Sequence, residues 1–285
     1  HYPLRRQRQM CIRDRRFPDN IAFILGEEQM TYKQLNILAN KTANALIKLG
    51  LKKGDKVTLS CPNLTSFPAI YYGILKAGGT VVPINVLLKP AEITYLLNDS
   101  NSKFHFCYEG SKDLPMGKLG YEGFTNSLNC EHFIEITNVL KNQKSQFKDA
   151  LSFGELILSE DPKFNNCSTE ADDVAVILYT SGTTGKAKGA QLTHFNMFYN
   201  AKICTDLFEM TPNEKELVIL PLFHSFGQTV LMNASIFVAS TAVLMPKFSP
   251  KEALKLMVKH KITIFAGVPT IYWALLNHPE VKTYT

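Results

Sequence analysis

Arginine is missing from most of this chain. All six arginines lie in the first 16 of the 285 residues, within "HYPLRRQRQMCIRDRR". From residue 17 onward 25 lysines face 24 acidic residues, so the net charge of +6 belongs almost entirely to the opening segment. A basic surface for nucleic acid is therefore not expected in the remainder. The opening segment resembles translated sequencing-adapter read-through, and we expect residues 1–16 to be a non-native leader; a basic targeting or nucleic-acid arm is the alternative.

Paired cysteine motifs are also missing. The six cysteines include no C-x-x-C pair and stand near no cluster of histidines, which excludes the usual spacing of a zinc site. A chain of this length does not need a disulfide scaffold to build a core. We therefore expect reduced thiols and a cytoplasmic protein, with peripheral contact with a membrane as a further option.

Charged residues are missing from residues 218–246, a run long enough to cross a bilayer. The run nevertheless contains Pro221, His224 and several Ser, Asn and Gln residues, whose polar groups are costly in lipid. We expect a buried strand, helix and strand here, and no transmembrane segment. An integral membrane protein that uses this run as a span is the alternative.

Helix and strand signals alternate from residue 17 onward, which predicts an α/β fold with largely parallel sheets. Thr31 with Gln34, and Ser249 with Glu252, have the spacing of a capping box at a helix start. Residues 109–166 are less regular, with a weak strand signal at 132–136, and we interpret them as a surface connection or a joint between subdomains. The predicted helices are 31–50, 66–77, 89–99, 193–208, 227–240, 249–261 and 269–279; the predicted strands are 56–61, 80–85, 104–108, 172–178, 216–221, 241–246 and 262–267.

The stretch "YTSGTTGKAKG", residues 179–189, consists mainly of Gly, Ser, Thr and Lys. Glycine lets backbone N–H groups approach an anion, hydroxyls add donors, and Lys186 and Lys188 add charge. A strand before it and a helix soon after it would form a phosphate loop with a helix N-terminus. The stretch is neither a Walker A motif nor G-x-G-x-x-G. A polar surface loop is the alternative interpretation.

Five blocks in order resemble the adenylate-forming superfamily of acyl-CoA synthetases, luciferases and peptide-synthetase adenylation domains. They are "MTYKQLNILANKTANALIKLGLKKGDKV", "YYGILKAGGTVVPINVLLKPAEITYLLNDSNSK", "YTSGTTGKAKGAQLTH", "ILPLFHSFGQ" and "FAGVPTIY". The nearest branch is that of bacterial-type long- or medium-chain fatty-acid–CoA ligases. The resemblance implies an incomplete large N-terminal domain, with residues 17–166 as its first α/β part and residues 167–285 as its second, which carries the phosphate loop.

The resemblance also implies a two-step reaction with ATP, Mg²⁺, CoA and a carboxylic acid as ligands. Lys186 and Thr184 would act at the phosphates, with Thr184 as a possible contact of the metal, and His224 would lie beside the carboxylate and the α-phosphate. A lone His among apolar residues is otherwise a satisfied core side chain. The implied ATP-phosphate residues are Thr180, Ser181, Gly182, Thr183, Thr184, Gly185, Lys186, Lys188 and Gly189; the implied pocket residues are His224, Phe226, Gly227, Gln228, Gly267, Val268, Pro269 and Thr270.

Motifs that the family carries after "FAGVPTIY" are not found in the chain, including the Glu that holds magnesium and the small C-terminal domain. We therefore expect a fragment that holds phosphate but is inactive alone. An adenylation enzyme for aryl or amino acids and a non-catalytic nucleotide-binding module are the alternatives. No partner beyond small molecules is expected, nucleic acid is not expected, and the sequence assigns neither chain length of the acid nor oligomeric state.

Overall fold

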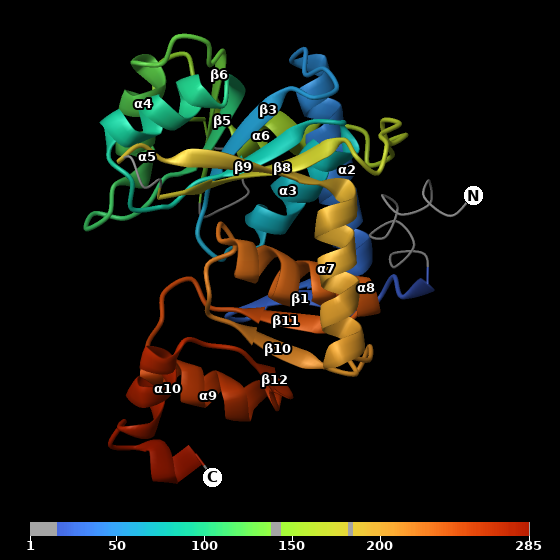
Figure 1. Cartoon of the computed structure of the whole chain (residues 1–285), viewed down its shortest axis with the longest axis vertical. Coiled ribbons are helices and arrows are strands. Elements are labelled where there is room, and N and C mark those ends of the chain that lie inside the picture. Colours follow the sequence, from blue (N-terminus) through green and yellow to red (C-terminus); the bar gives the residue numbers. More distant parts are fainter. Residues whose placement is uncertain (1–15, 138–143, 182–184, 285) are drawn as a thin grey trace. The chain divides into compact units, whose positions relative to one another are not determined.

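The computed structural model describes residues 16–137, 144–181 and 185–284 (Figure 1). The chain forms two compact units. Unit 1 combines Asn36–Cys61 with Ser66–Met197, and unit 2 combines residues 16–35, Pro62–Thr65 and residues 198–284. The sequence analysis divides the chain into two continuous parts, 17–166 and 167–285. Each of the two compact units instead combines segments from both of these parts.

Unit 1 is built on a mostly parallel sheet. Among the described residues its strand order is β7-β6-β5-β3-β4-β8-β9, and only the pair β8–β9 is antiparallel. Helices connect the strands (Figure 1), as expected for right-handed βαβ units. The strands are β3 (Lys56–Ser60), β4 (Thr80–Pro83), β5 (Ser102–Tyr108), β6 (His132–Ile136), β7 (Leu151–Ser152), β8 (Val174–Thr180) and β9 (Lys188–Thr193); the helices are α2 (Tyr32–Lys48), α3 (Ser66–Lys76), α4 (Pro90–Asp99), α5 (Met116–Thr125), α6 (Phe153–Leu158) and the start of α7 (His194–Leu207).

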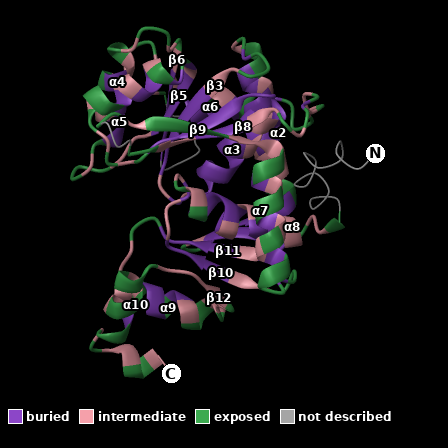
Figure 2. Ribbon diagram, in the orientation of Figure 1, coloured by how far each residue is buried: buried purple, intermediate pink, exposed green. Residues whose placement is uncertain are grey.

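The inner strands of the unit 1 sheet are mostly buried, as Figure 2 shows for β3 and β5, whereas β9 is largely exposed. Strand β4 is buried at every position, which explains why its sequence reads as a continuous apolar run. Helices α2 and α3 approach closely at Gly73, where an added Cβ would lie 2.5 Å from the Cβ of Thr42. Glycine at this position therefore sets the distance between the two helices.

The interpretation of residues 109–166 as an irregular surface connection is wrong. This segment supplies α5, β6, β7 and α6, and β6 and β7 extend the parallel sheet. Phe133 and Phe153 are almost completely buried, and Phe133 packs edge-on against Tyr121 at a ring distance of 5.4 Å. The elements are short, and tertiary packing rather than local propensity stabilises them.

Unit 2 contains a second sheet, with strand order β12-β10-β11-β1-β2 among the described residues. The pair β1–β2 is antiparallel and the others are parallel, so the mixed α/β fold with mostly parallel sheets is confirmed. The strands are β1 (Ile21–Leu25), β2 (Glu28–Thr31), β10 (Lys215–Val218), β11 (Thr241–Leu244) and β12 (Ile264–Phe265); the helices are η2 (Gly227–Asn233), α8 (Ala234–Val238), α9 (Pro250–His260), α10 (Pro269–Leu276) and η3 (Val281–Tyr284).

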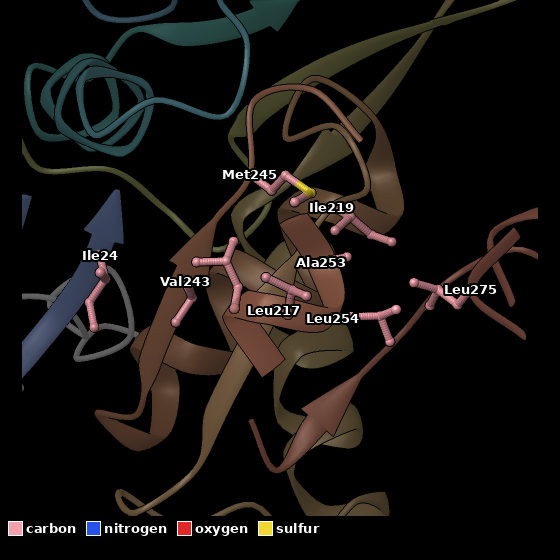
Figure 3. Packing of buried hydrophobic residues seen from close by; sticks show 9 residues of the cluster. Ile24, Leu217, Ile219, Val243, Met245, Ala253, Leu254 and Leu275 are labelled. Atoms are coloured by element: carbon pink, nitrogen blue, oxygen red, sulfur yellow. The ribbon is translucent and has the colours of Figure 1, made fainter. Parts of the chain in front are cut away.

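The core of unit 2 lies between the sheet and α9 (Figure 3). Leu217 and Val243, from adjacent strands, are almost completely buried and form one cluster with Ala253 of α9. Ile24 and Leu275 join the same cluster. Residues that are distant in sequence therefore share one apolar core, to which burial of each large side chain contributes about 1.5–3 kcal/mol.

Local signals for helix starts are confirmed at two positions. The N–H of Thr31 donates to Gln34 Oε1 at 2.8 Å and the N–H of Gln34 donates to Thr31 Oγ1 at 3.2 Å, which is the predicted capping box of α2. Ser249 likewise accepts a hydrogen bond from the N–H of Glu252 at the start of α9. The β1–β2 hairpin that precedes α2 was not expected from the sequence.

The uncharged run 218–246 folds as the end of β10, the helices η2 and α8, and strand β11, which confirms the predicted strand, helix and strand. Within the described part of the chain, no helix has both the length and the apolar character that a membrane crossing requires.

Candidate functional site

The predicted phosphate loop is the connection of a β-hairpin in unit 1. Strand β8 ends at Thr180 and strand β9 begins at Lys188, and these two residues face each other in the ladder. Thr180, Ser181, Gly185 and Lys186 are exposed. The predicted site residues Gly182, Thr183 and Thr184 lie outside the described residues. The hairpin therefore presents the described part of the loop to solvent.

The helix expected soon after the loop is α7, but a strand that was not expected separates the two. The loop is followed by β9, in which Lys188 and Gly189 are strand residues, and α7 begins only at His194. Six strand residues span about 20 Å at the usual rise. The partial positive charge of a helix N-terminus acts only within the first turn, so α7 does not contribute to binding at the loop. The loop depends on its own N–H groups, hydroxyls and lysines.

The base of the hairpin is fastened to α4 by two tyrosines. Tyr179 of β8 donates its hydroxyl hydrogen bond to Asp99 Oδ2 at 2.6 Å. Tyr95 donates to the carbonyl oxygen of Ala187, just before β9, at 2.9 Å. Burial, with Asp99 as a second cause, raises the pKa of Tyr179, so this phenol stays protonated as a donor. Both ends of the loop are thus held on one helix.

Two glycines of the loop region are required for different reasons. Gly185 has a φ of +87° with no atom near a Cβ position, so only its backbone conformation favours glycine. Gly189 has no such φ, but a Cβ there would lie 2.8 Å from Ile177 Cγ2 and 3.3 Å from Tyr179 Cζ. Gly189 therefore leaves room for the Tyr179 ring that reaches Asp99.

Lys186 and Lys188 supply the charge of the loop. Both are exposed, and neither makes a hydrogen bond or ion pair that involves residues 16–137, 144–181 or 185–284. Their ammonium groups are free to contact an anion, and each is a flexible point charge suited to phosphate oxygens.

In unit 2, His224 lies in the segment that follows β10. Its side chain is exposed, so the interpretation as a satisfied core histidine is wrong. The N–H of His224 donates to the carbonyl oxygen of Pro221 at 3.1 Å, and the carbonyl oxygen of His224 accepts from the N–H of Gln228 at 3.1 Å. The backbone around His224 is therefore a tight turn that leads into η2.

Asn63 supports this turn and was not anticipated from the sequence. Its side-chain amide is 3% exposed and donates to the carbonyl oxygens of Val218, Leu220 and Met245, while Oδ1 accepts from the N–H of Leu222 at 2.9 Å. One side chain thus satisfies the backbone at the ends of β10 and β11. Asn63 is 155 residues from Val218, and no local pattern could have revealed the pairing.

The other pocket residues after β10 differ in exposure. Phe226 is 40% exposed, whereas Gly227 is buried and a Cβ there would lie 2.1 Å from the Pro221 oxygen. Gln228 is completely buried, and neither atom of its amide has a partner among the described residues. Gly227 begins the π-helix η2, a helix type that occurs often at functional sites.

The segment Gly267–Thr270 follows β12 and leads into α10. Val268 is 47% exposed, Pro269 occupies the first turn of α10, and Thr270 is exposed. Because β10 and β12 are adjacent and parallel, this segment and the His224 turn follow strand ends at the same edge of the sheet. Ligands of open α/β sheets bind at that edge. The predicted pocket residues thus belong to unit 2 and follow strand ends at one edge of its sheet, and the phosphate loop lies in unit 1.

No metal centre is found in the part of the chain that the structure describes. The described residues contain no group of three or more His, Cys, Asp or Glu that could hold a metal ion. Thr184, the predicted metal contact, lies outside them.

Three comparisons place this geometry among known proteins. The family model described as AMP-binding enzyme matches residues 11–285. A long-chain-fatty-acid–CoA ligase of Bacillus subtilis is 33% identical over 287 residues, covering 94% of this chain and 51% of the relative. A long-chain-fatty-acid–CoA ligase of Salmonella typhimurium is also 33% identical, with the same coverage. The chain spans about half the length of the curated relatives it matches.

Solved structures agree with these relatives. The N-terminal domain of FACL13 from Mycobacterium tuberculosis, in an inhibitor-bound crystal structure, has a TM-score of 0.81 at 27% identity and covers 97% of this chain and 66% of its own. ATP-bound MatB from Rhodopseudomonas palustris has a TM-score of 0.80 at 26% identity, covering 98% of this chain and 53% of its own. The family match over nearly all of the sequence shows that the chain belongs to the family of AMP-binding enzymes.

Proposed function

We propose that this chain supplies the phosphate loop and part of the acyl pocket of an AMP-forming fatty-acyl-CoA ligase. In the first step a carboxylate oxygen of the fatty acid bonds to the α-phosphorus of ATP, and the bond to pyrophosphate breaks. In the second step the CoA thiol loses its proton, its sulfur bonds to the acyl carbon, and AMP leaves. ATP, the fatty acid and CoA are the substrates, and Mg²⁺ is the metal that accompanies ATP.

The loop holds the β- and γ-phosphates in this proposal. Lys186 and Lys188 are exposed and carry positive charge that no described residue neutralises. The hydroxyls of Thr180 and Ser181 lie beside them and can donate to phosphate oxygens. Gly182, Thr183, Thr184 and Gly185 complete the loop, and Gly189 sets its base. Charge that stabilises departing pyrophosphate in this way is a common source of catalysis.

His224 acts on the carboxylate side in this proposal. Its imidazole is exposed at the strand-end edge of the unit 2 sheet, where a ring N–H can donate to a carboxylate or α-phosphate oxygen. The acyl chain is assigned to residues 226–228 and 267–270. These segments carry exposed apolar side chains, those of Phe226 and Val268, which suit an apolar substrate more than a charged one.

The single observation that carries the proposal is the exposed, lysine-bearing loop of the β8–β9 hairpin in a chain whose relatives are named fatty-acid–CoA ligases. The described residues contain no group of three or more His, Cys, Asp or Glu that could hold Mg²⁺, and no step is assigned to a metal ligand of this chain. Mg²⁺ bound with ATP would lower the negative charge that the loop must balance.

Binding of ATP to the 285-residue chain tests the loop. Isothermal titration calorimetry with Mg-ATP is expected to show saturable binding, and Lys186→Gln is expected to weaken it by about tenfold, the loss of one charge-assisted contact. Lys118→Gln removes an exposed lysine of α5 far along the chain and serves as the matched control. Equal binding by the Lys186→Gln chain and the unchanged chain would contradict the assignment of the loop.

Release of pyrophosphate tests the substrate class. The rate is compared for palmitate, an aryl acid and an amino acid, both with this chain and with a longer product that has the full length of the relatives. We expect negligible release by this chain alone and a preference for palmitate in the longer product. A preference for the aryl or amino acid would replace the fatty-acid assignment while leaving adenylate formation in place.

A further inference from the structure

Unit 1 contains a cavity that is not part of the phosphate loop. Its volume is ≈ 200 Å³, which is about the space of six or seven water molecules. Lys56, Thr80 and Val174, each the first residue of its strand, line it. Because β3, β4 and β8 are parallel neighbours, the cavity lies at the amino-terminal edge of the sheet, whereas the phosphate loop follows the carboxyl end of β8.

The cavity is lined by a buried hydroxyl group that has no partner. Thr169 is 7% exposed, and its Oγ1 makes no hydrogen bond within the described part of the chain. A buried hydroxyl without a partner is costly and is normally satisfied by a solvent molecule or a ligand. Gly54 lies on the same lining, and a Cβ at Gly54 would meet no atom within 4 Å. There is therefore open space beside a free donor.

The charge of the lining is positive. Lys53 is paired with Asp173 at 2.8 Å, and Asp173 Oδ2 also accepts from the N–H of Glu170 at 2.7 Å, so this carboxylate is already engaged. The ammonium group of Lys56 makes no hydrogen bond or ion pair with any residue that the structure describes. One positive charge is thus left without a counter-charge.

His194 adds a further polar group at the start of α7. It lines the cavity as the first residue of this 14-residue helix. The first N–H groups of α7 are already engaged, since those of His194 and Phe195 donate to the carbonyl oxygens of Asp173 and Ala171 and that of Asn196 donates to Thr193 Oγ1. Burial lowers the pKa of His194, so the imidazole is neutral at pH 7 and adds no charge to the lining. The ammonium group of Lys56 and the hydroxyl of Thr169, on one small cavity, match the oxygens of an anion.

We propose that the cavity lined by Lys56, Thr169 and His194 binds a small oxyanion, separately from the nucleotide. Lys56 supplies the charge and Thr169 Oγ1 donates a hydrogen bond. The lining of the cavity reaches Ile177 and Gln191, so about 10 Å of strand separates it from Thr180 and Lys188 at the base of the loop. This inference does not rest on the proposed ligase activity.

Inorganic phosphate is the probe, titrated into the ¹⁵N-labelled 285-residue chain with sodium chloride at equal ionic strength in a parallel titration. We expect saturable shifts of the amide signals of Gly54 and Thr169 below about 10 mM phosphate, and no such shifts with chloride. Thr169→Val removes the hydroxyl at constant shape and Lys56→Gln removes the charge. Each is expected to weaken binding at these amides by about tenfold, whereas Lys118→Gln leaves it unchanged.

Three results would overturn the proposal. The first is the absence of saturation at Gly54 and Thr169. The second is a response to phosphate confined to the loop residues Ser181, Gly185 and Lys186, which would place the anion at the nucleotide site alone. The third is equal binding by the unchanged, Thr169→Val and Lys56→Gln chains. The two variants alter different groups, so the test does not depend on either one folding.

Discussion

A buried glutamate makes the stability of unit 2 depend on pH. Glu216 lies on β10, inside the sheet, and is 1% exposed. Its Oε1 accepts from Ser235 Oγ at 2.6 Å, and its Oε2 has no partner among the described residues. The hydroxyl of Tyr32 donates to the carbonyl oxygens of Ser235 and Ser240, which fixes both serines. Burial raises the pKa of Glu216 to about 8, an effect that the hydrogen bonds from Ser235 and Ser240 offset only in part.

The sign of the effect follows from proton binding. In the unfolded chain the carboxyl of Glu216 has a pKa near the ordinary value of 4.5. Between pH 4.5 and about 8 the folded chain therefore keeps a proton that the unfolded chain has released. The contribution of this proton to the free energy of unfolding is fully present below pH 4.5 and is lost as the pH rises to 8. Each pH unit in this window lowers the free energy of unfolding by about 1.4 kcal/mol, so the loss is about 3 kcal/mol by pH 7 and about 5 kcal/mol above pH 8.

Glu216→Gln tests this account, because glutamine keeps the shape and hydrogen bonds but does not titrate. Urea unfolding followed by far-UV circular dichroism at pH 5, 6, 7 and 8 gives the free energy of unfolding of each chain. The advantage of the Gln variant over the unchanged chain is expected to grow by about 4 kcal/mol from pH 5 to pH 8. Glu122→Gln, at an exposed position on α5, should follow the unchanged chain. Parallel curves for the Glu216→Gln and unchanged chains would refute the reasoning.

Three further substitutions test the framework of the candidate site. Gly189→Ala places a Cβ 2.8 Å from Ile177 Cγ2 and should destabilise unit 1 by about 1–3 kcal/mol in urea unfolding; an unchanged midpoint would show that the hairpin adjusts freely. Tyr95→Phe removes the hydrogen bond to Ala187 and should weaken Mg-ATP binding several-fold in calorimetry with little change in overall stability; a loss of stability alone would limit Tyr95 to a structural role. Asn63→Ala leaves the N–H of Leu222 without its partner and should lower thermal stability by about 1–3 kcal/mol, and a neutral result would mean that water replaces the amide.

The helix starts show what local sequence can predict. Thr31 with Gln34 and Ser249 with Glu252 were recognised because a capping interaction joins residues three apart, and both are present in the structure. Pro90 likewise marks the first turn of α4. These signals depend on a few neighbouring residues, so the surrounding fold does not alter them.

Strand β9 shows where local sequence is insufficient. Its residues, "KGAQLT", contain one β-branched residue and one large apolar residue, so they carry little intrinsic strand preference. They form a strand because β8 offers its free edge, with Thr180 opposite Lys188 and Tyr179 opposite Gly189. The same applies to α5 and α6, which are stabilised by packing against a sheet that is formed from distant parts of the chain.

The sequence by itself determined the alternation of helices and strands, the family resemblance carried by "YTSGTTGKAKG" and "PLFHSFG", and the balanced charge after residue 16. These features are local or ordered along the chain. Only the tertiary structure decided that the loop is a hairpin connection held by Tyr95 and Asp99, that Asn63 supports the His224 turn, and that Glu216 is buried. The physical reason is that hydrogen bonding and burial pair residues 80 to more than 150 positions apart, and no short pattern records which pairs will meet.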